Sequence, residues 1–220
     1  MAESSEYQQK KAAEQLSNYV LSRMKQGKDK KAIAAELKAD GAQHEQVDRV
    51  VGEMYDAIMK AARHQQFTSA SWQPAIVGGL GAAIIGGIIW SLIMIYTGYE
   101  AGLVAWGLGW FTGWAVVKLT GGKKGIQAQA VAVICSLIGI FLGKYISFYH
   151  FLSTQQGETS GAEISFFSMA LLQQFFEHIK GLVQPLDLLF FGAAVYTAWT
   201  LTRGLGLKVP ETGVPPELMR

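Results

Sequence analysis

The feature that most constrains this chain is the uneven placement of its charged residues. Residues 1–66 hold 21 of the 36 Lys, Arg, Asp and Glu side chains, and residues 65–99 contain none. Within that uncharged run, the apolar stretch 75–96 would be about 33 Å long as a helix, which is enough to cross the hydrocarbon layer of a bilayer. The chain is therefore expected to divide into a charged region and a membrane-embedded region.

Three further stretches with few charges predict additional membrane spans. Together with the first they give a four-span transmembrane helical bundle, and the fold class expected is all-α. The bundle should be preceded by a soluble three-helix module and followed by a flexible tail. The spans lie at about 75–96, 101–117, 126–149 and 186–202, and the domains at 1–66 (module), 67–208 (membrane domain) and 209–220 (tail).

The charged region has the pattern of three helices separated by Gly27 and Gly41, with Asp29 placed to cap the second helix and Asp40 to end it. The segment QGKDKKAIAAELKADGAQHEQVDRVV resembles small helical modules of the ubiquitin-associated type and bacterial helical hairpins. A solvated spacer and a protein-binding module both fit this pattern. Apolar residues at helical spacing would form its core: Leu16, Tyr19, Val20, Met24, Ile33, Leu37, Val47, Val50, Val51, Met54 and Ile58.

The positions of Lys and Arg beside the spans predict the orientation of the chain, because cytoplasmic loops are rich in these residues. All of the loops agree on cytoplasmic N- and C-terminal segments in a bacterial cytoplasmic (inner) membrane. The basic residues on the cytoplasmic side are Lys60, Arg63, Lys118, Lys123, Lys124, Arg203 and Lys208.

An amphipathic helix is expected at about 161–180, between the third and fourth spans. A capping box at 160–163 would start it, and Gly181 with Pro185 would end it. A helix lying in the outer membrane interface fits this pattern, and a re-entrant segment or a buried oligomer contact stays open. Its apolar stripe is Ile164, Phe167, Leu171, Leu172, Phe175, Phe176 and Ile179.

Ladders of small residues with a spacing of four predict close helix packing in the first two spans. The short turn between these spans makes them an antiparallel hairpin, so most ladder contacts should form inside one chain. The first span has two ladders, which leaves one for contact with a second copy. The ladder residues are Gly78, Ala82 and Gly86; Gly79, Ala83 and Gly87; and Ala105, Gly109 and Gly113.

The stretch GLGAAIIGGIIWSLIMIYTGYEAGLVAWGLGWFTGWAVVKLTGGKKG resembles uncharacterised bacterial multi-pass membrane proteins with a Gly/Ala-rich helical hairpin, over about residues 75–145. The resemblance implies a packing arrangement and no reaction. Trp106, Trp110 and Trp114 follow one another at turn spacing on one face of the second span. Lipid contact and packing explain them more simply than stacking on a flat ligand.

Three ionisable residues in or beside the spans form a candidate outer charged cluster: Glu100, Lys144 and Asp187. Such groups are costly in hydrocarbon, so they invite a functional hypothesis. Their predicted depths agree, which allows an ion pair of Lys144 with either carboxylate. Independent extension of each side chain to the interface and an ion or proton entry site are the alternatives.

Catalytic, metal and cofactor sites are not predicted. The four histidines never pair at a metal-ligand spacing, and GxSxG, HExxH and CxxC are absent. The single cysteine, Cys135, has apolar neighbours and is expected to be buried. A net charge of +2 gives no electrostatic footprint for nucleic acid.

The function expected is non-enzymatic: a scaffold, adaptor or accessory subunit that acts through its helical module and Gly-rich spans. Its partners would be the lipid bilayer, a cytoplasmic or membrane protein, and a second copy of itself. A small oligomeric ion channel or transporter that uses the outer charged cluster is the alternative.

Overall fold

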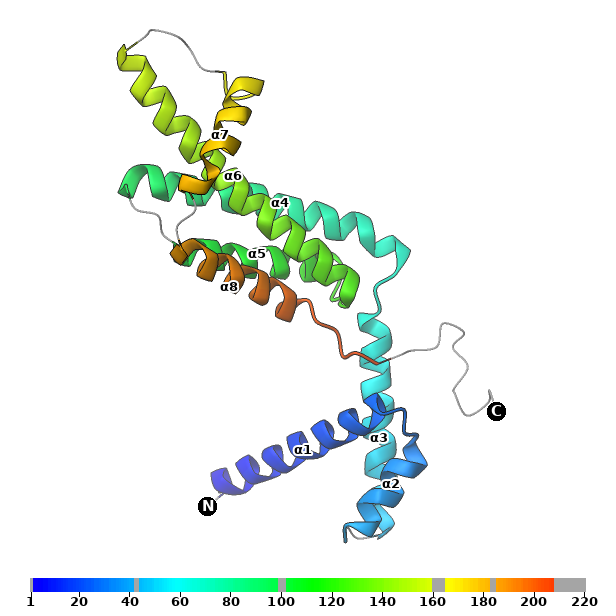
Figure 1. The fold of residues 1–220 in the computed structure, drawn as a ribbon. Helices are drawn as coiled ribbons and strands as arrows, with labels where there is room; N and C mark the ends of the chain where they lie inside the picture. Colours follow the sequence, from blue (N-terminus) through cyan, green and yellow to red (C-terminus); the bar gives the residue numbers. More distant parts are fainter. Residues whose placement is uncertain (1, 42–43, 99–101, 160–164, 183–184, 208–220) are drawn as a thin grey trace. The chain divides into compact units, whose positions relative to one another are not determined.

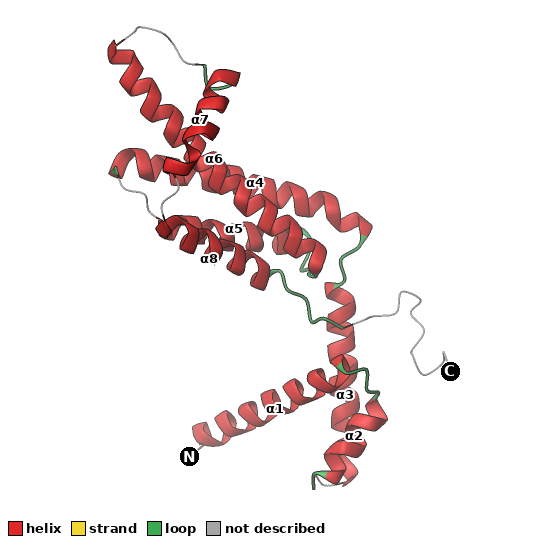
Figure 2. Ribbon diagram, viewed as in Figure 1, coloured by secondary structure: helices red, strands yellow, loops and turns green. Residues whose placement is uncertain are grey.

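A computed structural model describes residues 2–41, 44–98, 102–159, 165–182 and 185–207. These residues form α-helices joined by short segments, with one 3-10 turn at Ser69–Ser71 and no strand (Figure 1, Figure 2). The all-helical fold class is therefore confirmed. Two compact units divide the chain: residues 1–66 with the segment that begins at 204, and residues 67–203.

The first unit contains three helices, α1 (Ala2–Lys25), α2 (Lys30–Ala39) and α3 (His44–Gln65). Gly27 and Gly41 follow the first two helices with φ angles of 81° and 94°, a conformation that glycine adopts without a steric penalty. The predicted cap at Asp29 is present, since its carboxylate accepts a 2.8 Å hydrogen bond from the Ala32 N–H. Asp40 is the C-cap of α2.

One hydrophobic cluster holds the first unit together. Val20 of α1 and Ile33 of α2 are completely buried in it, and Val47 and Val51 contribute from α3. Leu207, which follows the second unit in sequence, packs against the same cluster. The segment from 204 therefore belongs with the first unit, whereas the sequence pattern had placed the boundary after residue 208. Partial burial of the Leu207 side chain against this cluster gives the physical reason.

The second unit contains five helices. Contacts join α4 to α5 and α6, α5 to α6 and α8, and α6 to α8, so these four form one bundle (Figure 1). The four predicted apolar stretches correspond to these helices, but α6 continues well beyond residue 149. The helices are α4 (Trp72–Thr97), α5 (Gly102–Leu119), α6 (Ile126–Thr159), α7 (Met169–Leu182) and α8 (Pro185–Leu201).

The start of α7 differs from the expected helix at 161–180. Residues 165–168 are not helical, and the Ser168 hydroxyl accepts a 3.2 Å hydrogen bond from the Leu171 N–H, as an N-cap does. Ser168 supplies the cap because its side chain reaches the first turn. The capping box at 160–163 lies outside the described residues.

The apolar stripe of α7 also divides in two. Leu171 and Phe175 are buried against Phe148 of α6. Phe167 and Phe176 are exposed, at 91% and 58%. One edge of the stripe thus packs on the bundle and the other edge faces outward.

Two helical segments of the described chain, 69–97 and 126–155, are long and apolar enough to cross a membrane. The apolar segment 187–201 of α8 is shorter, and α5 does not meet the same criterion. In the most apolar 18-residue stretch of each long segment, only 44% and 50% of the residues are buried. About half of the residues in these stretches are therefore partly or fully exposed.

Replacing the α2 cap tests the local structure of the first unit. Asp29→Ala should lower its free energy of unfolding by about 1 kcal/mol, because an N–H of the first turn loses its acceptor. Asp29→Asn keeps an acceptor and should behave like the original protein. Thermal denaturation followed by circular dichroism measures the effect, and equal midpoints for the Ala and Asn variants would contradict the capping role.

Candidate functional site

The ladder Gly78, Ala82 and Gly86 faces α5. A Cβ atom added to Gly78 would lie 3.0 Å from the carbonyl oxygen of Ala115, and one added to Gly86 would lie 3.2 Å from the Leu108 side chain. Ala82 is buried. The small residues therefore let α4 and α5 approach closely, as helices in lipid do.

The ladder Gly79, Ala83 and Gly87 faces α6. A Cβ atom at Gly79 would lie 2.6 Å from Cys135 Sγ, and one at Gly87 would lie 2.7 Å from the carbonyl oxygen of Gly139. Both α4 ladders are thus occupied within the chain. The expectation that one of them is left for a second copy is wrong, because α6 fills the position assigned to that copy.

The ladder Ala105, Gly109 and Gly113 faces α8. A Cβ atom at Gly109 would lie only 2.2 Å from the carbonyl oxygen of Ala194, and one at Gly113 would lie 3.4 Å from Ala198 Cα. Ala105 shares a buried cluster with Ala194. These contacts form inside one chain, as expected for most ladder contacts, but the neighbouring helix is α8. The helix α4 meets α5 through its own small residues.

The sequence reasoning missed the partners of these ladders on α6 and α8. Gly139 and Gly143 of α6 lie against α4, and Ala194 and Ala198 of α8 lie against α5. Both pairs have the same spacing of four residues that identified the ladders of the first two spans. Applying that criterion to the later spans would have found them.

Lys144 of α6 and Asp187 of α8 form a buried ion pair. The distance from Nζ to Oδ2 is 2.9 Å, and the two side chains are 5% and 7% exposed. The Lys144 ammonium also lies 6.0 Å from the centre of the Phe191 ring. Of the predicted charged cluster, the structure brings these two residues together, and Glu100 lies outside the described residues. Each charge compensates the other, which reduces the cost of burying both.

A second polar contact joins α6 and α8 near their other ends. Gln129 Nε2 donates a 3.0 Å hydrogen bond to the carbonyl oxygen of Trp199, and the Gly125 N–H donates a 3.0 Å bond to that of Thr202. Gln129 was not predicted, because the sequence pattern near the start of α6 does not indicate which of Gln127 and Gln129 faces a neighbouring helix. The two helices are therefore antiparallel and joined by polar groups at positions about 22 Å apart along α6.

The three tryptophans of α5 are each about half exposed on the outside of the bundle. The rings of Trp110 and Trp114 stack with centroids 6.4 Å apart, and Trp106 Nε1 donates a 2.7 Å hydrogen bond to Thr197 Oγ1 of α8. Their contacts are with one another and with a neighbouring helix, which fits packing at an apolar surface.

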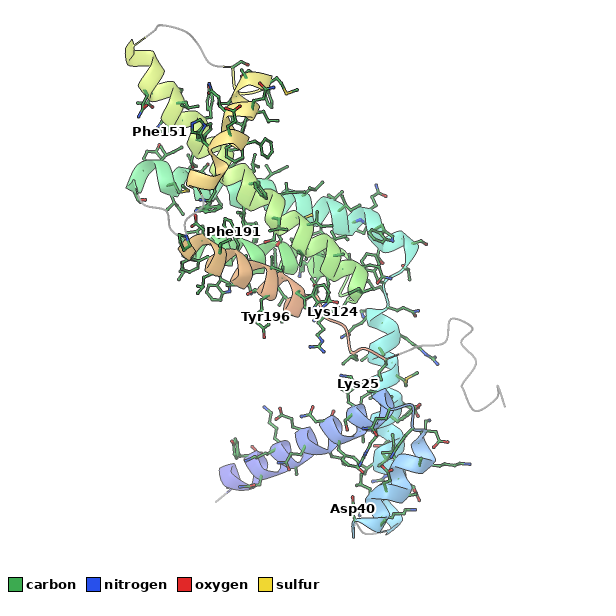
Figure 3. The ribbon with its side chains drawn as sticks, viewed as in Figure 1. Lys25, Asp40, Lys124, Phe151, Phe191 and Tyr196 are labelled. Atoms are coloured by element: carbon green, nitrogen blue, oxygen red, sulfur yellow. The ribbon has the colours of Figure 1, made fainter. Side chains whose placement is uncertain are left out.

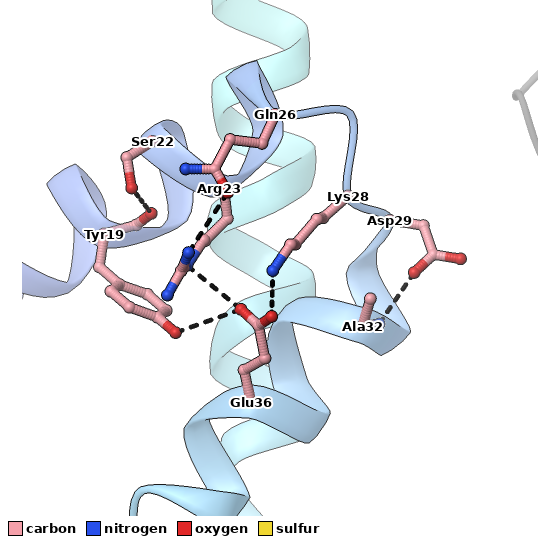
Figure 4. A network of polar contacts seen from close by, with 8 residues as sticks. All are labelled: Tyr19, Ser22, Arg23, Gln26, Lys28, Asp29, Ala32 and Glu36. Carbon is pink, nitrogen blue, oxygen red and sulfur yellow. Dashed lines mark hydrogen bonds and ion pairs between the residues drawn. The ribbon is translucent and has the colours of Figure 1, made fainter.

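In the first unit, a polar network centred on Glu36 joins α1, α2 and the turn between them (Figure 4). Glu36 pairs with Lys28, with Arg23 Nε at 3.1 Å, and accepts a bond from Tyr19 Oη at 3.4 Å. The bond with Lys28 holds the pKa of Glu36 below its ordinary value. Its stabilisation is therefore present above the unfolded pKa and is lost as the pH falls through the lower folded pKa.

Within the described residues, no group of three or more His, Cys, Asp or Glu side chains is arranged to hold a metal ion. Comparison with known proteins finds no matching family model, no similar curated protein and no similar solved structure. The resemblances noted from the sequence therefore stay predictions. The buried ion pair and the small-residue contacts are the features that the structure offers for a functional argument.

The contact between Gly109 and Ala194 gives a sharp test of helix packing. Gly109→Ala should destabilise the bundle by about 1–3 kcal/mol, because the new Cβ would meet backbone atoms that cannot rotate away. Gly107→Ala is the matched control on the same helix, since nothing lies within 4 Å of its added Cβ. Unfolding of the purified protein in mixed detergents measures both, and indistinguishable midpoints would contradict the packing described.

The ion pair gives a second test. Lys144→Met should cost about 3–5 kcal/mol, because the Asp187 carboxylate would stay buried without its cation. The double variant Lys144→Met/Asp187→Leu should recover most of the loss, whereas Lys118→Met, at an exposed lysine, should have little effect. The same unfolding measurement applies. A double variant no more stable than the single one would contradict the attribution of the loss to an unpaired Asp187 carboxylate.

Proposed function

We propose that the chain is a multi-pass integral membrane protein whose four spans are α4, α5, α6 and α8. This proposal is based on where small and large side chains lie in the second unit. Gly and Ala make the closest contacts between its helices, while α4 exposes a large apolar surface. A surface of this extent needs a cover, and bilayer hydrocarbon provides one on all sides. The exposed residues of α4 include Ile76, Val77, Leu80, Ile84, Ile85, Ile88, Ile89 and Leu92.

The two shorter helices also fit the bilayer. α5 has 18 residues and α8 has 17, which is the lower end of the range of about 17–25 residues for a span. Tyr196 projects away from α8 (Figure 3) and is 70% exposed. The polar contacts at Lys144 and at Gln129 keep α8 beside α6 over most of its length. A helix held antiparallel to a long apolar helix in this way should cross the same layer.

The basic residues give the orientation. Lys118 lies in the last turn of α5, Lys123 and Lys124 lie in the turn between α5 and α6, and Arg203 follows α8. Four spans place these residues on the same side as residues 1–66, which we assign to the cytoplasm of a bacterium. The Lys144–Asp187 pair then lies near the outer end of the bundle.

We assign α7 to the outer membrane interface. The buried edge of α7 packs on α6. Tyr145 of α6 also donates a 2.6 Å hydrogen bond to the carbonyl oxygen of Phe166, which lies just before α7 in the sequence. Met169 and Phe176 are exposed and apolar, so they suit contact with the lipid surface. This arrangement would hold α7 against both the bundle and the bilayer.

The role we propose is that of a scaffold, adaptor or accessory subunit without enzymatic activity. The first unit is small and has its own core, so it suits binding of a protein partner. The channel alternative is less well supported. Backbone contact at Gly109 closes the space between α5 and α8, and contact at Gly87 closes that between α4 and α6, so a path between either pair requires the helices to separate.

Single cysteines introduced in a Cys135→Ala background test the topology. Intact bacteria are treated with a membrane-impermeant maleimide, and labelling is compared with that after lysis. Thr154→Cys should react in intact cells, whereas Lys124→Cys and Lys60→Cys should react only after lysis. If α4 and α6 alone cross the membrane, Lys124→Cys reacts in intact cells and Thr154→Cys does not. Labelling of Lys60→Cys in intact cells would instead indicate the inverted orientation.

Purification from native membranes in mild detergent tests the role. A stoichiometric protein partner that is lost on removal of residues 1–66 would support the adaptor. A pure homo-oligomer that conducts ions in liposomes, with conduction abolished by Lys144→Ala, would support the channel instead.

A further inference from the structure

The first unit contains a cavity of about 650 Å³. Its walls are the turn between α1 and α2, one face of α3 and the segment at 206–207. On α3, Tyr55, Met59 and Arg63 are four residues apart and so lie on one face. The volume is within the range of about 300–1,000 Å³ that is usual for ligand pockets.

Part of the cavity lining is apolar. Met24, Tyr55, Met59 and Leu207 contribute to it from three separate segments of the chain. Met24 is buried and the other three are half-buried. Methionine side chains adapt to differently shaped partners. This part of the cavity suits an apolar side chain.

Most of the remaining lining residues are charged, with an excess of cations. Two of its cations are compensated inside the unit, since Lys30 Nζ lies 2.6 Å from Asp56 Oδ1 and Lys28 pairs with Glu36. Asp29 is engaged in capping α2. Lys25 and Arg63 form no ion pair with any residue in the described part of the chain. The charged lining residues are Lys25, Lys28, Lys30, Arg63, Asp29 and Asp56.

We propose that this cavity binds a short acidic peptide segment of a partner protein. An apolar side chain of the peptide enters the cavity beside Met24, Met59 and Leu207. Carboxylates of the acidic residues of the peptide pair with Lys25 and Arg63. Charge complementarity favours this occupant, because the lining charges outside ion pairs are the cations of Lys25 and Arg63 and the single carboxylate of Asp29, which leaves a positive excess. Nucleic acid is disfavoured, since the whole chain carries a net charge of only +2. The inference rests on the proposed function in that it names the kind of partner which the adaptor engages.

The test uses the full chain in nanodiscs of zwitterionic lipid and a fluorescein-labelled synthetic peptide of twelve residues, with Glu flanking a central Leu-Phe. Fluorescence anisotropy should show saturable binding that weakens as salt is raised. Lys25→Glu and Arg63→Glu should each raise the dissociation constant about fivefold or more. Circular dichroism confirms that the variants are folded.

Matched controls separate this site from general charge effects. Lys60→Glu makes the same charge change at an exposed position of α3 outside the cavity, and should leave the dissociation constant within about twofold. Peptides with Lys in place of Glu, or with Gly-Ser in place of Leu-Phe, should bind at least tenfold more weakly. The proposal is overturned if the acidic peptide does not bind, if Lys60→Glu weakens binding as much as Arg63→Glu, or if either altered peptide binds equally well.

The peptide-binding experiment does not depend on how many times the chain crosses the membrane. Peptide binding by a chain whose cysteine labelling indicates two spans would support the cavity and reject the four-span proposal. Correct labelling without peptide binding would leave the membrane assignment and reject the cavity as the partner site.

Discussion

Backbone contact between helices is the constraint on which the second unit depends. In lipid, apolar side chains gain little by leaving the hydrocarbon for a protein interior, so helices associate through dispersion contacts, which need a close approach. Gly109 against Ala194 and Gly87 against Gly139 provide that approach. Many large apolar side chains are then directed outward, where the proposed bilayer would contact them. The exposed isoleucines of α4 and the tryptophans of α5 follow from the same requirement.

Polar groups of the bundle supplement this packing. The pair of Lys144 with Asp187 and the bond from Gln129 to Trp199 join α6 to α8 near opposite ends. Small-residue contacts allow helices to slide along one another, because one glycine resembles the next. A charge pair allows one alignment only, since an offset of one turn would leave two charges in an apolar environment. The glycines therefore determine which helices meet, and the polar contacts determine their axial alignment.

Sequence reasoning succeeded where the signal is periodic or local. The cap at Asp29 and the apolar residues of α1 to α3 follow from spacing alone, and the charge-free stretches located α4 and α6. It failed where the answer depends on which elements become neighbours. The spacing of Gly109 and Gly113 shows that something approaches closely, but it does not show that the neighbour is α8 and not α4. Similarly, the sequence offered two candidate carboxylates for Lys144, and the three-dimensional structure shows that Asp187 is a partner, while Glu100 lies outside the described residues. The return of Leu207 to the first unit has no local signal either, because a single leucine after a span looks like the start of a tail.

The return of Leu207 has a consequence for the order in which the protein is made. Residues 1–66 leave the ribosome first, yet one wall of their cavity consists of Gly206 and Leu207, which are translated only after α8. The helical domain therefore stays incomplete throughout synthesis of the five helices that follow it. A chain truncated before its last helix would lack that wall of the cavity. Partner recognition through this cavity would thus begin only after the whole second unit had been translated.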